Sequence, residues 1–206
     1  MTDLREEAFT LGEGAVEVEL WPDPAWSRDS TGDPARYARV IELDDRHRQA
    51  TGMEVRVAGR VASTAVVLGE MGCPDVAWSK ALLRGDTLLV TMAAKVVALA
   101  VPSLEVRWIT DVDDACVIGL MEIGEDDAVL VHGEIAITRL GMDGRIRWRR
   151  AGWDIFTGGC RIEGGEVVAV DWNESVYRWR LPDGEVLHDP PPPVLVADPR
   201  YGRAAG

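Results

Sequence analysis

The feature that most constrains this chain is an internal repeat. Segments that begin at Gly85, Glu125 and Gly165 align over 24 residues without a gap, which gives a period of 40 residues. Each segment contains short runs rich in β-branched residues, and these runs are too short for helices. An internal period decides the architecture before any single residue is considered. The repeat therefore predicts an all-β fold built from copies of one unit.

Each copy is expected to form an antiparallel sheet. Turn-forming residues separate the last two apolar runs of a copy, as in Met142-Asp143-Gly144 and Pro182-Asp183-Gly184. A further apolar run precedes each copy and supplies a fourth strand. Four antiparallel strands in about 40 residues is the size of a propeller blade. The expected strands are residues 80–83, 87–92, 95–101 and 105–109 in the first copy, 117–123, 128–132, 135–140 and 145–149 in the second, and 156–162, 167–171, 175–181 and 185–187 in the third.

The end of each copy carries a recognisable motif. Asp143 and Gly144 are followed by Trp148, Trp108 lies one period earlier, and Asp183-Gly184 lies one period later. This pattern resembles the blades of pyrroloquinoline-quinone-type and WD-like β-propellers over residues 75–189. The copies depart from the family pattern at Leu104, where the turn glycine is missing, and at His188, where the tryptophan is missing. No residue matches the quinone or metal ligands of those enzymes, so the resemblance implies no cofactor.

The remaining chain is assigned by its weaker similarity to the repeat. Residues 1–70 are expected to form an N-terminal β segment, with strands at 15–20, 38–43, 54–57 and 65–69, and to be a degenerate first blade. Residues 71–189 hold the three blade-like repeats, and residues 190–206 form a Pro-rich C-terminal tail. Four blades would close a small propeller-like ring, whereas three would leave an open repeat sheet.

The charge and cysteine content limit the partners and the compartment. Against 22 basic residues the chain has 35 acidic ones, a net charge of -13, which disfavours nucleic acid and anionic membranes and favours a basic partner. No apolar run is long enough to span a membrane, and the acidic N-terminus lacks the apolar core of a signal peptide. The three cysteines, Cys73, Cys116 and Cys160, occupy different positions in the repeat frame, which predicts reduced thiols and a cytoplasmic location.

The sequence contains no convincing catalytic or metal motif. Asp111, Asp113 and Asp114 lack the glycine and distal glutamate of a calcium loop, so a solvated turn is expected. The histidines are far apart in the sequence, at positions 47, 132 and 188. The prediction is therefore a protein that is not an enzyme and binds no cofactor or metal.

Tryptophans that break the repeat are the candidate binding residues. The chain has eight tryptophans, and Trp108 and Trp148 belong to the repeat frame. Trp172 does not, and it lies in a predicted hairpin turn between polar residues, the composition of an interface hot spot. Trp26 also lies in a predicted loop. The predicted partner-binding residues are Trp172, Asp171, Asn173, Trp179 and Trp153.

These observations favour a non-enzymatic protein-binding module on a propeller-like scaffold. One specific form is a bacterial inhibitor or immunity-type protein for a basic partner, since opposite charges strengthen such encounters. The alternative is a small-molecule-binding protein or enzyme that uses a central channel. A third interpretation makes the chain one part of a ring that a second copy completes, so both a monomer and a homodimer are consistent with the sequence.

Overall fold

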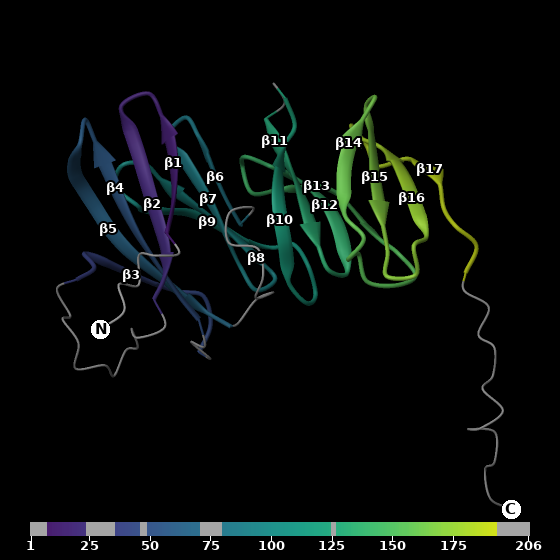
Figure 1. Cartoon of the computed structure of the whole chain (residues 1–206), viewed down its shortest axis with the longest axis horizontal. Helices are drawn as coiled ribbons and strands as arrows, with labels where there is room; N and C mark the ends of the chain where they lie inside the picture. The colour runs from purple at the N-terminus through teal and green to yellow at the C-terminus, as the bar shows by residue number, and fades with distance from the viewer. Residues whose placement is uncertain (1–7, 24–35, 46–48, 71–79, 125–126, 193–206) are drawn as a thin grey trace, which may run out of the picture. The chain divides into compact units, whose positions relative to one another are not determined.

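The computed structural model describes residues 8–23, 36–45, 49–70, 80–124 and 127–192. The regular structure in these ranges is β-strand, arranged as one five-stranded and three four-stranded sheets (Figure 1). The chain divides into two compact units, Met1–Ala151 and Gly152–Gly206. The all-β prediction and the blade-like repeats are confirmed.

The first sheet lies within the N-terminal 70 residues and has the order β1-β2-β4-β5-β3. Three of its pairs are antiparallel, but β3 runs parallel to β5, with Val40 opposite Val66. The sequence predicted strands at 15–20, 38–43, 54–57 and 65–69 in this segment, but it predicted neither the parallel pair nor a strand at β1. The strands are β1 (Phe9–Glu13), β2 (Val16–Pro22), β3 (Arg39–Glu42), β4 (Gln49–Val57) and β5 (Arg60–Gly69).

The second and third sheets are the first two copies of the repeat. Each is a four-stranded antiparallel meander whose strands pair in chain order. The second sheet contains β6 (Ala81–Arg84), β7 (Thr87–Met92), β8 (Lys95–Ala100) and β9 (Val106–Asp111). The third contains β10 (Val117–Glu122), β11 (Ala128–Gly133), β12 (Ala136–Gly141) and β13 (Ile146–Ala151).

Sheets of the first unit pack face to face, which explains the uninterrupted apolar runs of the second sheet. Leu88 and Val90 of β7 lie in a core shared with the first sheet, whereas Leu89 lies in a core shared with the third. Successive side chains of a strand point to opposite faces, so a strand between two cores is apolar at every position. Near this packing, β1 lies beside β6, and Gly85 N donates to a carboxylate oxygen of Glu13 at 2.6 Å.

The fourth sheet is the third copy of the repeat and belongs to the second unit. It is again an antiparallel meander, in the order β14-β15-β16-β17. Its strands are β14 (Cys160–Glu163), β15 (Glu166–Val170), β16 (Val176–Arg180) and β17 (Val186–His188). Two loops of this unit, residues 152–159 before β14 and residues 171–175 between β15 and β16, carry the candidate site.

Candidate protein-binding surface on the fourth sheet

A buried carboxylate shapes the turn between β15 and β16. Asp171 is only 2% exposed. Its Oδ1 accepts hydrogen bonds from Asn173 N and Ser175 N, both at 2.9 Å, and its Oδ2 accepts one from the Tyr177 hydroxyl at 2.9 Å. An Asp side chain that bonds backbone groups two and four residues later is a standard way to fix a tight turn. Asp171 thus fixes the backbone that presents Trp172.

Hydrogen bonds join this turn to the loop of residues 152–159. Trp172 N donates to Ile155 O at 2.8 Å, and Asn173 Nδ2 donates to Asp154 Oδ2 at 2.6 Å. The two loops therefore form one surface. We call it the Trp153–Trp172 surface and define it as Trp153, Asp154, Ile155, Trp172, Asn173 and Glu174.

A hydrogen bond to Tyr177 of strand β16 also holds the loop of residues 152–159. Trp153 N donates to the Tyr177 hydroxyl at 2.8 Å, the same hydroxyl that donates to Asp171. Burial raises the pKa of Tyr177 to about 12, so its hydroxyl keeps its proton at neutral pH. One neutral phenol thus connects both loops to strand β16.

Aromatic packing under the surface makes its base rigid. The Tyr177 and Trp179 rings are stacked with centroids 5.6 Å apart, and Phe156 meets both edge to face at 5.3 and 5.9 Å. Trp179 is only 2% exposed. Of the predicted contact residues, Trp179 and Asp171 therefore lie in the interior, where they support the surface without touching a partner. The burial of Trp179 could have been predicted from the sequence, because period-two alternation along β16 places Trp179 on the same face as Tyr177.

The outer part of the surface is aromatic and acidic. Trp172 is 68% exposed and Trp153 is 53% exposed, and Asn173 and Glu174 are also exposed. Neither residues 152–160 nor residues 171–177 contain Lys or Arg. The structure thus brings together three of the five predicted partner-binding residues, Trp153, Trp172 and Asn173, on two loops that hydrogen bonds join.

Asp113 is a buried structural carboxylate of the first unit. It is 4% exposed and accepts hydrogen bonds from Ala115 N at 2.8 Å, Ile135 N at 3.1 Å and Ala136 N at 2.8 Å. The expectation of a solvated turn is wrong for this residue, because its carboxylate is used to bind backbone N–H groups. Asp111 and Asp114 are exposed and pair with Lys95 and Arg149.

The histidine and cysteine predictions have mixed outcomes. His132 is buried in β11, and His47, Trp26 and Cys73 lie outside the described residues. Cys116 is disulfide-bonded, which corrects the expectation of a reduced thiol. Cys160 is free, and burial raises its pKa to about 12.

A second polar cluster, which the sequence analysis missed, lies on the first sheet. Trp21 Nε1 donates to the Tyr37 hydroxyl at 3.1 Å, which donates to Asp23 Oδ2 at 2.6 Å, and Arg36 pairs with the same oxygen at 3.2 Å. Gly52 lies beneath it, where a Cβ atom would come within 2.2 Å of the Tyr37 oxygen. Trp21, Asp23 and Tyr37 are all buried, so the cluster is a structural network.

Neither a metal site nor a membrane helix is found in the described ranges. The described residues hold no group of three or more His, Cys, Asp or Glu side chains arranged to bind a metal ion. In the same part of the chain, no helix has the length and apolarity needed to cross a membrane.

Comparison with known proteins addresses the fold. No family model matches the sequence, and no curated protein matches it. Among solved structures, the chain is similar to the computationally designed protein Ika8, with a TM-score of 0.51 and 12% identity over 88% of this chain and 60% of that one. The chain has a β-propeller fold.

Two natural proteins are similar at a lower level, and the chain spans only part of each. BamB from Moraxella catarrhalis gives a TM-score of 0.49 at 16% identity over 74% of this chain and 52% of BamB. A europium-containing methanol dehydrogenase gives 0.43 at 18% identity over 53% of this chain and 23% of that enzyme. The blade-like repeats predicted from the Asp-Gly and Trp pattern are confirmed at the level of fold by the four-stranded sheets and the similarity to Ika8.

Proposed function

We propose that this propeller is a non-enzymatic protein-binding module that contacts its partner through the Trp153–Trp172 surface. The observation that carries the proposal is the pair of exposed tryptophans on loops that a buried hydrogen-bond network fixes in place. Tryptophan is strongly enriched among residues that dominate binding energy at interfaces. Exposed side chains of this size are rarely left in water without a binding role when they occur together.

Rigidity of the two loops supports the same function. A flexible loop loses conformational entropy when it binds, which costs about 0.5–1.5 kcal/mol for each side chain that becomes ordered. Here Asp171 and Tyr177 already order the backbone on both sides of Trp172. Because folding has already ordered this backbone, binding a partner at this surface should cost less conformational entropy.

A basic partner suits the charge of the protein and of the surface. The net charge of -13 attracts cationic proteins at long range. Near the tryptophans, Asp154 and Glu174 are acidic and no Lys or Arg is present in either loop. A Lys or Arg side chain of the partner would find both a carboxylate and an indole face there. A bacterial inhibitor or immunity-type protein for a basic protein is one form of this function.

Affinity capture with matched variants tests the proposal. The full chain, Trp172→Ala and Val61→Ala are immobilised separately and exposed to lysate from the source organism at about 50 mM and about 500 mM salt, which span strong and weak screening. Val61 is a suitable control because it is also an exposed apolar residue, at 53%, on β5 of the first unit.

The expected result is a basic protein that the full chain and Val61→Ala retain at low salt. Trp172→Ala should lose it, and high salt should weaken its retention. Equal retention by Trp172→Ala and the full chain would contradict the assignment of the surface, and retention of only acidic proteins would contradict the charge argument.

A further inference from the structure

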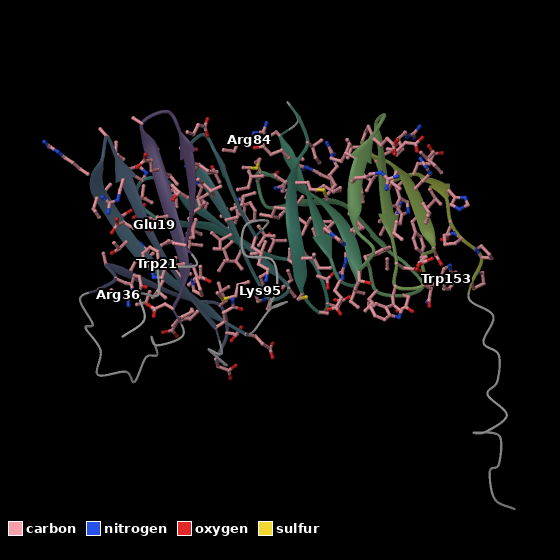
Figure 2. All side chains as sticks on the ribbon, viewed as in Figure 1. Glu19, Trp21, Arg36, Arg84, Lys95 and Trp153 are labelled. Atoms are coloured by element: carbon pink, nitrogen blue, oxygen red, sulfur yellow. The ribbon has the colours of Figure 1, made fainter. Side chains whose placement is uncertain are left out.

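The chain's own proline-rich segment lies on the candidate surface. Residues 189–192 follow β17 and read Asp-Pro-Pro-Pro. Trp153 Nε1 donates a hydrogen bond to Pro190 O at 3.0 Å, and Pro190 is buried while Pro191 and Pro192 are exposed. Figure 2 labels Trp153 beside the point where the chain leaves β17.

This contact has the chemistry of polyproline recognition. Consecutive prolines favour the polyproline II conformation, whose backbone carbonyls have no internal hydrogen-bond partners. Aromatic surfaces bind such segments at low entropic cost because the ligand is already extended. The indole N–H is a donor only, and a proline residue offers only its backbone carbonyl as a hydrogen-bonding group. Trp153 can therefore bind the unpaired carbonyl of a proline-rich segment.

We infer that the Trp153–Trp172 surface binds proline-rich segments with basic flanks, and that residues 189–192 occupy part of it in cis. The inference rests on the proposed function, since it concerns the same surface, and it specifies the chemistry of the partner. Trp153 holds one proline carbonyl, and the 68% exposed ring of Trp172 offers a second aromatic face. The basic flanks follow from Asp154 and Glu174.

Occupancy in cis predicts competition. A segment attached to its own site through a few residues has an effective concentration on the order of 1 mM. If the attached segment binds the vacant surface with an intrinsic dissociation constant of about 0.1 mM, it weakens the apparent affinity of an external peptide about tenfold. Removing the prolines from the full chain should therefore strengthen the binding of an external proline-rich peptide.

Titration of the full chain with two synthetic peptides tests this inference. The probe is acetyl-RPPPPR-amide and the control, with the same charge, is acetyl-RSSSSR-amide. The proteins are the wild type, the triple variant Pro190→Ser, Pro191→Ser, Pro192→Ser, and that variant with Trp153→Phe. Indole N–H resonances report binding, and the signal absent after Trp153→Phe is that of Trp153.

The proline peptide should shift the Trp153 resonance and bind the triple variant about tenfold more tightly than the wild type. Trp153→Phe keeps an aromatic ring but removes the donor, so it should weaken binding about three- to tenfold. Unchanged dispersion of the other indole resonances checks that the triple variant is folded. A double variant that keeps Pro190, Pro191→Ser with Pro192→Ser, should bind the peptide no more than slightly better than the wild type.

Other results would overturn the inference. Equal binding of the serine peptide would show attraction by charge alone, and equal affinity of the wild type and the triple variant would exclude occupancy in cis. A captured partner that depends on Trp172 but has no proline-rich segment would leave the proposed function standing and remove this inference. Binding of the proline peptide without any captured partner would support this inference and count against the proposed function.

Discussion

Asp171 has three hydrogen-bond donors around a buried carboxylate, two from the following turn and one from Tyr177. Removing it would leave the N–H groups of Asn173 and Ser175 and the hydroxyl proton of Tyr177 without their acceptor. Asp171→Ala is therefore expected to lower the free energy of unfolding by about 2–4 kcal/mol. Asp183→Ala is the control, because Asp183 is exposed and pairs with Arg180 at the surface, and it should cost much less than Asp171→Ala. Urea unfolding followed by tryptophan fluorescence gives both values, and equal losses would contradict the assigned role of Asp171.

Trp172, unlike the buried Asp171, contributes little to stability, since its side chain is 68% exposed. Trp172→Ala removes little buried surface and should change the free energy of unfolding by no more than about 0.5 kcal/mol. Trp179→Ala, in contrast, empties an aromatic core position that is 2% exposed and should cost about 3–5 kcal/mol. The same urea experiment compares the two, and a large loss for Trp172→Ala would mean that its ring supports the fold.

Tyr177 makes the second unit sensitive to alkaline pH. Its pKa is raised from the usual value of 10 to about 12 by burial, so the folded state favours the protonated phenol. The stabilisation is complete below pH 10 and is lost as the pH rises toward 12. Tyrosinate absorbance should show a component near pH 12 that is missing in Tyr177→Phe. A wild type and Tyr177→Phe that differ only near pH 10 would contradict the burial argument.

Some residues of the candidate site could be predicted from the sequence. Trp172 was identifiable because it breaks the 40-residue frame in a polar turn, and Trp153 because it lies in a loop. The joining of these two loops could not be predicted, since it depends on the hydrogen bond that Asn173 donates to Asp154 and on the one that Trp153 N donates to the Tyr177 hydroxyl. Those contacts follow from tertiary structure and leave no spacing signal in the sequence.

At the scale of elements, the repeat motif docks one sheet onto the next. Trp108 of β9 donates from Nε1 to Met142 O at 2.9 Å, and Thr110 donates to Gly144 O at 2.8 Å. Gly144 lies against the Trp108 ring, where an added Cβ atom would be 2.7 Å from the indole, and its φ of +79° is one that glycine adopts most easily. The Asp-Gly turn and the tryptophan therefore form one structural unit across two sheets.

This docking predicts different effects for two glycine substitutions. Gly144→Ala combines a strained backbone with a clash and should lower the free energy of unfolding by about 2–4 kcal/mol. Gly165→Ala has a similar φ of +84° but nothing within 4 Å of the added atom, so backbone strain alone should cost about 1–2 kcal/mol. Thermal or urea unfolding compares the two variants. Equal losses would show that the contact with Trp108 contributes nothing.

Strand prediction succeeded where a local pattern was sufficient. Most strands of the repeat copies follow from alternation, apolar runs and turn residues, and β7 (Thr87–Met92) has the predicted bounds. The strand predicted at 156–162 is wrong for residues 156–159, which form a loop before β14 (Cys160–Glu163). The parallel pairing of β3 with β5 could not be found in this way, because short turns predict only antiparallel neighbours. Strand β1 (Phe9–Glu13) was missed because its five residues include two polar positions and a glycine and lack a clear apolar run.

For the whole molecule, the disulfide at Cys116 is the finding that bears on compartment. Disulfides persist in oxidising surroundings and are rare in a reducing cytoplasm. The cytoplasmic location therefore stays a prediction, and the state of Cys116 in the purified protein tests it. Protein purified without reductant and denatured in the presence of an alkylating reagent should show fewer reactive thiols than its three cysteines. Denaturation is required because the Cys160 thiol is partly buried and its pKa is about 12. Three reactive thiols would support the cytoplasmic prediction.

The net charge of -13 acts on the whole molecule, and under the proposed function it speeds association with a basic partner. Attraction between oppositely charged proteins speeds association and is screened by salt. The tryptophans, in contrast, act at short range and should mainly slow dissociation. With a recovered partner, raising the salt from about 50 to 500 mM should reduce the association rate about tenfold or more. Trp172→Ala should raise the dissociation rate at both salt concentrations, and a salt-independent association rate would contradict the role of charge.

The central claim is that the Trp153–Trp172 surface is the place where this propeller meets another protein. The most direct test places the photo-crosslinking amino acid p-benzoylphenylalanine at Glu174, an exposed position of the same surface, and so leaves Trp172 in place. The control makes the same replacement at Val61, the exposed position on β5. After irradiation in lysate of the source organism, a basic protein should be linked at position 174 and not at position 61. The same adducts at both positions, or none at position 174, would contradict the claim.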